Sequence, residues 1–258
     1  MAEAPAVIVP DWPAPPGVRA LVTTRPGGVS VGPHAGLNLS LSGGDAREAV
    51  LENRRRLGAL LPAPPRWWSQ VHGTRCVDAA QAADGTEADA AMTTTPGVVC
   101  AVLTADCLPV FLCAADGRAV AVAHAGWRGL LAGVIESAID ALRAADSDEL
   151  LVWYGPAIGP AAFEVGIEGR AAFVAEDAGA EAAFEPRGGG KFLADIYALA
   201  DRRLVRRGVR RPATTVFCTL SDAARFYSYR RDGVTGRMAS CIWIDQSGSG
   251  GAAAAARA

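Results

Sequence analysis

The 258-residue sequence contains only three histidines, His34, His72 and His124. A multicopper oxidase needs further imidazole ligands for its oxygen-reducing copper cluster, so this scarcity argues against that class of protein. The motifs H-E-x-x-H, paired C-x-x-C, and H-x-E with P-C-x-x-C are absent as well. Familiar zinc motifs therefore do not decide whether the chain binds a metal.

An excess of charge of either sign is also lacking. The 25 Lys and Arg residues against 27 Asp and Glu residues give a net charge of -2, which offers no general attraction to nucleic acid or to an anionic membrane. There is no secretion signal at the start and no apolar run long enough to span a membrane. We therefore expect a cytoplasmic protein with a small-molecule partner, no nucleic acid and no membrane, and with six cysteines that remain thiols.

Apolar residues are abundant, at 50% of the chain, and they alternate between helical and extended patterns. The alternation lacks the regular units of a Rossmann sheet or an α/β barrel, so it predicts an α/β fold of another kind. We expect one domain over residues 1–245 and a disordered low-complexity tail over residues 246–258. The expected helices cover residues 46–61, 129–146, 168–178 and 191–209. The expected strands include several within residues 98–125, one at 150–154, one at 214–220 and a final hairpin within 225–244.

The stretch from residue 104 to residue 129 carries the first candidate functional residues. Its apolar runs are joined at Asp116-Gly117, a strong signal for a tight hairpin turn. Cys107 stands at a break in the strand pattern near one end of this hairpin, and His124 ends the apolar run at the other. His72 likewise ends a strand-like segment before a glycine. Taken singly, a buried thiol or a hydrogen-bonded histidine is the commoner meaning of each residue.

Taken together, His72, Cys107 and His124 supply three nitrogen and sulfur ligands. Zn²⁺ with three protein ligands keeps a fourth position for water, which is the usual arrangement of a catalytic zinc site. A closed structural zinc would need a fourth protein ligand, from His34, another cysteine or a carboxylate. Copper also accepts a set of two histidines and a cysteine, so it stays open as a less favoured metal.

Other residues near this set suggest acid-base and anion-binding roles. Asp106 is a candidate general acid or base by adjacency to Cys107, although neighbouring strand residues point to opposite faces. Arg128 follows His124 at the start of a helix, where an anion would be well received. Arg25, Arg54 and Arg230 are further candidates for binding phosphate, and the sequence does not rank them.

Two short motifs are set aside. The string GVSVG, residues 28–32, fits the nucleophile-elbow pattern around Ser30, but it lacks the strand before and the helix after that this motif requires. The string GGGK, Gly188 to Lys191, has no Ser or Thr after the lysine, so we interpret it as a turn rather than a phosphate loop.

Eight strings now make the chain resemble a known family, the YfiH-type proteins, also called laccase-domain, polyphenol oxidase or purine nucleoside phosphorylase family proteins. They occur in order from about Leu21 to Ile244 and are TTRPGGVS, NRRRL, SQVHG, TADCLPV, HAGWRG, GPAIGP, FEVG and YSYRRDGVTGR. After GPAIGP this chain has Ala161, Ala162 and Phe163 where the family often has cysteines and a tyrosine.

The resemblance implies a single layered α-β-β-α domain with mixed sheets and a zinc site made by His72, Cys107 and His124. It implies phosphorolysis of adenosine, inosine and methylthioadenosine, and hydrolytic deamination of adenosine. Cys107, His124, Asp106 and Arg128 are then the candidate catalytic residues. The alternatives are a cytoplasmic amide hydrolase that edits peptidoglycan precursors, a copper-dependent phenol oxidase, which the histidine count disfavours, and a protein with a purely structural zinc.

Overall fold

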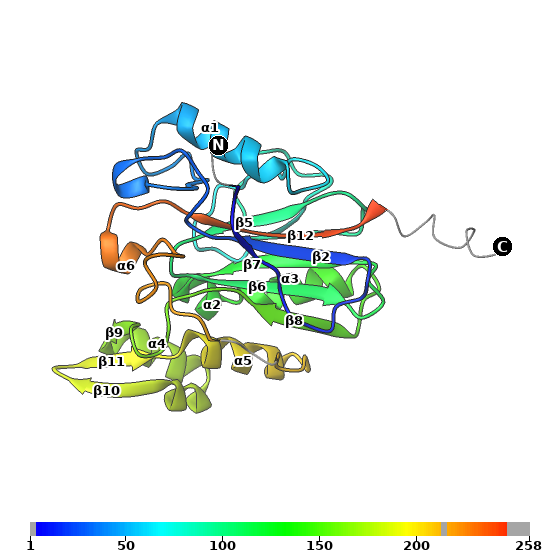
Figure 1. Cartoon of the computed structure of the whole chain (residues 1–258). Coiled ribbons are helices and arrows are strands. Elements are labelled where there is room, and N and C mark those ends of the chain that lie inside the picture. The colour runs from blue at the N-terminus through cyan, green and yellow to red at the C-terminus, as the bar shows by residue number, and fades with distance from the viewer. Residues whose placement is uncertain (1–3, 213–215, 247–258) are drawn as a thin grey trace, which may run out of the picture.

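A computed structural model describes residues 4–212 and 216–246, and within them the chain forms a mixed α/β fold (Figure 1). Most of the expected tail, residues 247–258, lies outside the described residues. The helices are α1 (Arg47–Gly58), α2 (Trp127–Ala132), α3 (Val134–Arg143), α4 (Ile167–Glu176), α5 (Ile196–Arg206) and α6 (Tyr229–Asp232). Short 3₁₀ helices cover Gly32–His34 and Ala178–Ala183. None of the helices in the described ranges has the length and apolarity needed to cross a bilayer.

Two large sheets form the centre. The first has the order β1-β2-β12-β5, is antiparallel throughout, and consists of β1 (Val7–Ile8), β2 (Val18–Thr23), β12 (Met238–Ile244) and β5 (Cys100–Thr104). The second has the order β3-β4-β7-β6-β8 and consists of β3 (Cys76–Asp78), β4 (Ala90–Thr93), β7 (Val120–Ala125), β6 (Leu108–Ala114) and β8 (Leu150–Tyr154). In the second sheet only β3 and β4 are parallel.

Three apolar clusters separate four layers, with α1 on one side of the stacked sheets and α3 and α5 on the other (Figure 1). One cluster lies between α1 and the first sheet and includes Leu57 and Cys241. The middle cluster joins the two sheets and includes Val102 and Phe111. The third packs α3 and α5 on the far face of the second sheet. The expected layered α-β-β-α arrangement is confirmed.

The hairpin formed by β6 and β7 has both faces covered. Every residue of these two strands is buried, in agreement with the continuously apolar sequence. Its turn contains Gly117 at φ +76°, and the Asp116 carboxylate accepts a hydrogen bond from the backbone N–H of Arg118. The predicted turn at Asp116-Gly117 is therefore confirmed.

Two expected helices have different bounds. The helix expected over residues 129–146 is divided at Gly133, whose φ of +106° ends α2 and begins α3. The helix expected over residues 191–209 starts only at Ile196, because Asp195 caps its first turn. The preceding residues, β11 (Lys191–Ala194), pair with β10 (Phe184–Gly188) and β9 (Glu164–Gly166) in a small third sheet.

The predictions for the C-terminal part were wrong in two places. Residues 216–220 of the strand expected at 214–220 lie outside the named strands, and 213–215 lie outside the described residues. The final hairpin does not form, because β12 pairs with β2 and β5 while the segment before it contains α6. Side chains replace the missing ladder: the Arg231 guanidinium donates to the carbonyl oxygens of Thr219, Leu220 and Phe226, and Ser228 caps α6. These bonds satisfy backbone groups that a strand partner would otherwise bind.

Candidate metal centre

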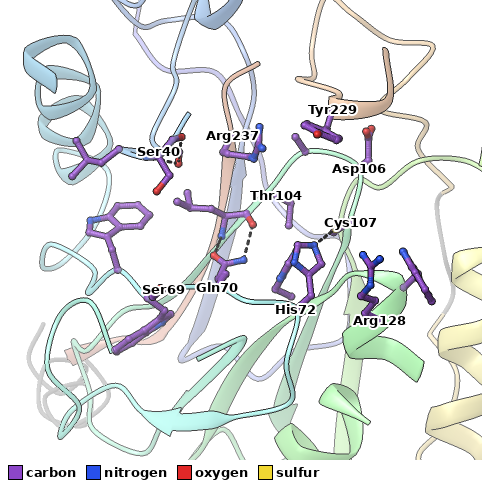
Figure 2. Close-up of a pocket in the computed structure, with 18 of the residues that line it drawn as sticks. Ser40, Ser69, Gln70, His72, Thr104, Asp106, Cys107, Arg128, Tyr229 and Arg237 are labelled. Carbon is purple, nitrogen blue, oxygen red and sulfur yellow. Dashed lines mark hydrogen bonds between the residues drawn. The ribbon is translucent and has the colours of Figure 1, made fainter. Parts of the chain in front are cut away.

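The structure brings His72, Cys107 and His124 together at one end of the second sheet. Their ligand atoms all lie within 4.8 Å of one another, and together they could hold a metal ion. The Cys107 sulfur lies 3.7 Å from His72 Nε2, a contact that a dashed line marks in Figure 2. The rings of His72 and His124 meet edge to face, with their centroids 4.7 Å apart. Within the described ranges, no other group of three His, Cys, Asp or Glu residues has such geometry.

The hairpin register explains how Cys107 meets His124. Pro109 of β6 is opposite His124 of β7, and Leu108 is opposite Ala125. Cys107 directly precedes Leu108, so its side chain reaches the position beside His124 without any long connection. The sequence-based expectation that one hairpin brings these two residues to the same sheet edge is confirmed by this pairing.

Asp89, which sequence reasoning missed, connects the two histidines. Its Oδ1 accepts a hydrogen bond from His124 Nδ1 at 2.8 Å and from the backbone N–H of His72 at 3.0 Å. Its Oδ2 accepts from the backbone N–H groups of Val71 and Gly73. The bond to Nδ1 leaves His124 Nε2 available to a ligand, as in the carboxylate–histidine–metal arrangements of known sites. The only sequence feature that could have pointed to Asp89 is its position directly before the apolar strand β4.

Backbone conformation and close packing also hold the three side chains. His72 has a φ of +60° and Asp106, next to Cys107, a φ of +90°, a region that residues with a side chain rarely adopt. A Cβ atom at Gly126 would lie 2.5 Å from His72 Cδ2 and 3.0 Å from the Cys107 sulfur. Only glycine therefore fits at this position while His72 and Cys107 keep their places.

The electrostatics favour a thiolate at Cys107. Burial alone would raise the pKa of this thiol, but the adjacent His124 and His72 outweigh burial and lower the pKa to about 6. Burial would lower the pKa of His124, but Cys107 and Asp89 outweigh it and raise the pKa to about 9. A thiolate and two imidazoles are soft and borderline donors that suit Zn²⁺ or copper better than Mg²⁺ or Ca²⁺. The donor set therefore fits a transition-metal ion or zinc.

A cavity of about 780 Å³ opens beside this set. Its wall includes apolar and aromatic side chains together with four arginines. The aromatic residues are Trp67, Trp68, Trp127, Phe163 and Tyr229, and the arginines are Arg54, Arg128, Arg230 and Arg237. Such a mixed wall suits an organic molecule with a flat ring and an anionic group.

Arg128 and Asp106, which the sequence places beside the metal set, both line this cavity but differ in how far the protein already binds them. Arg128 is in the first turn of α2, and its guanidinium lies 4.5 Å from the centre of the Trp127 ring and forms no hydrogen bond or ion pair with the described residues. Asp106 lines the cavity, but its Oδ1 accepts from the Thr219 hydroxyl at 2.6 Å and its Oδ2 from the backbone N–H of Arg230 at 2.7 Å. Both Asp106 oxygens are thus engaged in holding the wall of the cavity.

The other candidate arginines are more strongly committed to the protein. Arg25 is not among the lining residues and donates to the carbonyl oxygens of Ala35 and Ala223. Arg54 donates to the Leu39 carbonyl and lies 4.2 Å over Trp67, and burial lowers its pKa to about 10. Arg230 donates to the carbonyl of Glu164 and lies over the ring of Phe163 at 5.6 Å. Arg237 is a fourth lining arginine that sequence reasoning did not single out.

The motifs that were set aside have structural roles. Ser30 is buried, donates to Asp45 and accepts from Asn53, and only the three-residue 3₁₀ helix Gly32–His34 follows it, not the α-helix of a nucleophile elbow. Gly188 to Gly190, all with positive φ, form the turn between β10 and β11. His34 binds the Gly43 carbonyl with its Nε2 and is not part of the metal set.

A mixed α/β protein with a His-Cys-His set beside a large cavity is the class of protein that these observations define. Residues 19–245 match the family described as multi-copper polyphenol oxidoreductase laccase. The chain belongs to this family, and its relatives include proteins named YfiH, so the resemblance noted from the sequence is confirmed.

The curated relatives carry a different kind of name. The chain is 54% identical to a purine nucleoside phosphorylase of Pseudomonas aeruginosa, over 93% of this chain and 98% of the relative. It is 51% identical to the purine nucleoside phosphorylase YfiH of Escherichia coli, over 92% and 98%. Among solved structures, a Neisseria meningitidis protein superposes with a TM-score of 0.86 at 48% identity, covering 93% of this chain and 99% of that one.

Proposed function

We propose that this protein is a zinc-dependent purine nucleoside enzyme of the cytoplasm. Its reactions are phosphorolysis of adenosine, inosine and methylthioadenosine, and hydrolytic deamination of adenosine. The observation that carries the proposal is the convergence of His72, Cys107 and His124 beside a cavity with an aromatic and cationic wall. The purine nucleoside phosphorylase names of relatives that cover nearly the whole chain support the choice of substrate.

In this proposal Cys107, His72 and His124 are the metal ligands, with Asp89 holding His124 in the correct tautomer. When bound, a zinc ion supplies Lewis acidity at the one coordination position that three protein ligands leave open. The aromatic side chains Trp127, Phe163 and Tyr229 provide flat apolar surfaces for a purine ring. Arg128, which has no carboxylate partner in the described part of the chain, contributes positive charge for phosphate.

The residue inventory supports one metal rather than several. The third histidine, His34, is bonded to a backbone carbonyl away from the metal set, so the chain has no further imidazoles for an oxygen-reducing copper cluster. Copper at the single set remains the alternative metal, and a phenol oxidase the corresponding alternative activity. A closed structural site has no fourth ligand from His, Cys, Asp or Glu among the described residues.

The test is product identification with the zinc-loaded protein. Adenosine is supplied with and without phosphate, in parallel with a peptidoglycan precursor, and the products are identified by mass. Adenine with ribose phosphate supports phosphorolysis, and inosine supports deamination. An amino acid released from the precursor, with adenosine left intact, would instead favour the amide hydrolase. A Cys107→Ala variant with full metal content and full activity would refute the assignment of the site.

A further inference from the structure

Arg237 lies in the cavity with donors that the protein does not use. Its Nη1 donates to the carbonyl oxygens of Thr235 and Gly236, both at 3.0 Å, and its backbone N–H donates to Asn38. These bonds fix the side chain in place. They leave Nε and Nη2 without an acceptor among the described residues, and no carboxylate there forms an ion pair with this guanidinium.

The position of Arg237 brings it close to the metal set. It directly precedes Met238, which pairs with Thr104 of β5, and Cys107 follows Thr104 by three residues. Burial lowers the pKa of the Arg237 guanidinium, while the charges of Cys107 and Asp106 act to raise it. Arg237 is partly buried, and an anion in the cavity would supply acceptors for its unused donors.

The nearby carboxylate does not fill this role. Asp106 uses one oxygen for the Thr219 hydroxyl and the other for the backbone N–H of Arg230. Arg128 also lines the cavity, and its guanidinium has neither an acid partner nor a hydrogen-bond acceptor among the described residues. In the view of Figure 2, Arg237 and Arg128 are on either side of the His72 and Cys107 pair. The cavity thus presents, on the two sides of this pair, guanidinium groups that form no ion pair with a carboxylate of the described residues.

We propose that Arg237 and Arg128 together bind the phosphate that phosphorolysis consumes. This assignment rests on the proposed function and adds Arg237 as the residue that positions the oxyanion beside the metal set. The two free donors of Arg237 match the forked, bidentate geometry in which arginine binds phosphate. Arg54 fits less well, because its Nε is used by the Leu39 carbonyl and the nearby negative charge is that of Asp84, whereas the charge of Cys107 acts on Arg237. Arg230 also lines the cavity, and its Nη1 is used by the Glu164 carbonyl.

In the reaction, an oxygen of hydrogen phosphate forms a bond to C1′ of the ribose as the bond from C1′ to the purine nitrogen breaks. The electron pair of the broken bond stays on the purine, and the proton of hydrogen phosphate ends there. The products are the free purine and ribose 1-phosphate. The two arginines hold the phosphate oxygens and orient the attacking one, whereas deamination uses water and needs no such anion.

The experiment compares wild type with Arg237→Gln, Arg237→Lys and a matched control, Arg187→Gln, which removes an exposed arginine of β10 that does not line the cavity. Initial rates are measured with adenosine while phosphate is varied, and both adenine and inosine are quantified. Arg237→Gln should raise KM for phosphate about tenfold or more and lower the ratio of phosphorolysis to deamination by a similar factor. Arg237→Lys keeps the charge but loses the two-pronged donor geometry, so its KM for phosphate and its reaction ratio should lie between those of wild type and Arg237→Gln. Arg187→Gln should match wild type in both quantities.

A second readout does not depend on turnover. Inorganic phosphate should raise the melting temperature of the wild-type protein, and Arg237→Gln should lose this shift while melting normally without phosphate. An unchanged KM for phosphate, or an equal fall in both reactions, would overturn the assignment of Arg237. If wild type forms no ribose phosphate, the proposed function fails, and the thermal shift alone then decides whether Arg237 binds an oxyanion. If Arg237→Gln does not fold, the phosphate KM and thermal shift of Arg237→Lys decide instead.

Discussion

Substitution of Asp89 by Asn tests whether one buried carboxylate organises the metal centre. The Asp89 side chain is 1% exposed and accepts four hydrogen bonds, two at each oxygen. An amide replaces one of these oxygens by a donor. If the amide nitrogen takes the place of Oδ2, the bonds to the Val71 and Gly73 N–H groups are lost, and if it takes the place of Oδ1, the bond to the His72 N–H is lost. At about 1–3 kcal/mol for each buried donor left without an acceptor, the expected loss of unfolding free energy is about 1–6 kcal/mol.

Metal binding should weaken in the same variant. If the amide nitrogen faces His124, the imidazole must accept at Nδ1 and carry its proton on Nε2, the nitrogen that a metal would need. If it faces the backbone of Val71 and Gly73 instead, the loop that carries His72 loses its anchor. Either orientation should lower zinc affinity by about 10- to 100-fold.

The assay is urea unfolding of the metal-free protein together with zinc competition against a chromophoric chelator. Asp116→Asn is the matched control, because the side chain of this exposed acid bonds, among the described residues, only to Arg118 in its own turn. It should change zinc affinity less than twofold. Asp89→Asn protein with wild-type zinc affinity and a wild-type urea midpoint would refute the positioning role of Asp89.

Three further predictions concern other parts of the molecule. In metal-free protein, alkylation of Cys107 should accelerate as the pH rises through about 6, because its pKa is lowered to that value; peptide mapping should show this midpoint, and zinc should suppress the reaction. A midpoint above pH 8 would contradict the assignment of the thiolate. Gly126→Ala should abolish stoichiometric zinc by crowding the ligands, whereas Gly58→Ala in α1, with open space around its Cβ position, should keep zinc, as metal analysis of both proteins would show. Arg203→Met should lower the free energy of unfolding in urea by about 3–5 kcal/mol, because it leaves Glu136, the partner of Arg203 in a largely buried ion pair, without a cation. A loss below about 1 kcal/mol would contradict this prediction.

The hairpin and its two candidate ligands could be predicted because their signals are local. Asp116-Gly117 marks the turn, and the apolar runs on both sides have the length and burial pattern of covered strands. Once these strands pair, Cys107 and His124 meet without help from distant residues. His72 was also found, since a histidine before a glycine at the end of an extended segment is unusual enough to notice.

The residues that were missed depend on distant partners. Asp89 binds the backbone of a loop 16 to 18 residues earlier in the chain, and no local pattern distinguishes it from another buried acid. Arg237 is significant only because its remaining donors face a cavity that is formed by several separate segments. The C-terminal strand at 214–220 was predicted from apolar and β-branched composition. That composition does not reveal that Arg231 binds the carbonyls of this segment instead.

The double-sided burial of β6 and β7 has a consequence for the accuracy of folding. A shift of one residue in their pairing would turn each shifted side chain to the opposite face and place His124 on the helical side of its sheet. In a hairpin with one wet face, such a shift would expose apolar side chains on one side only. Here it would disrupt two packed interiors at once, so misregistered forms are strongly disfavoured. The packing that stabilises the sheet thus also selects the one strand register in which His124 and Cys107 lie together at the candidate metal centre.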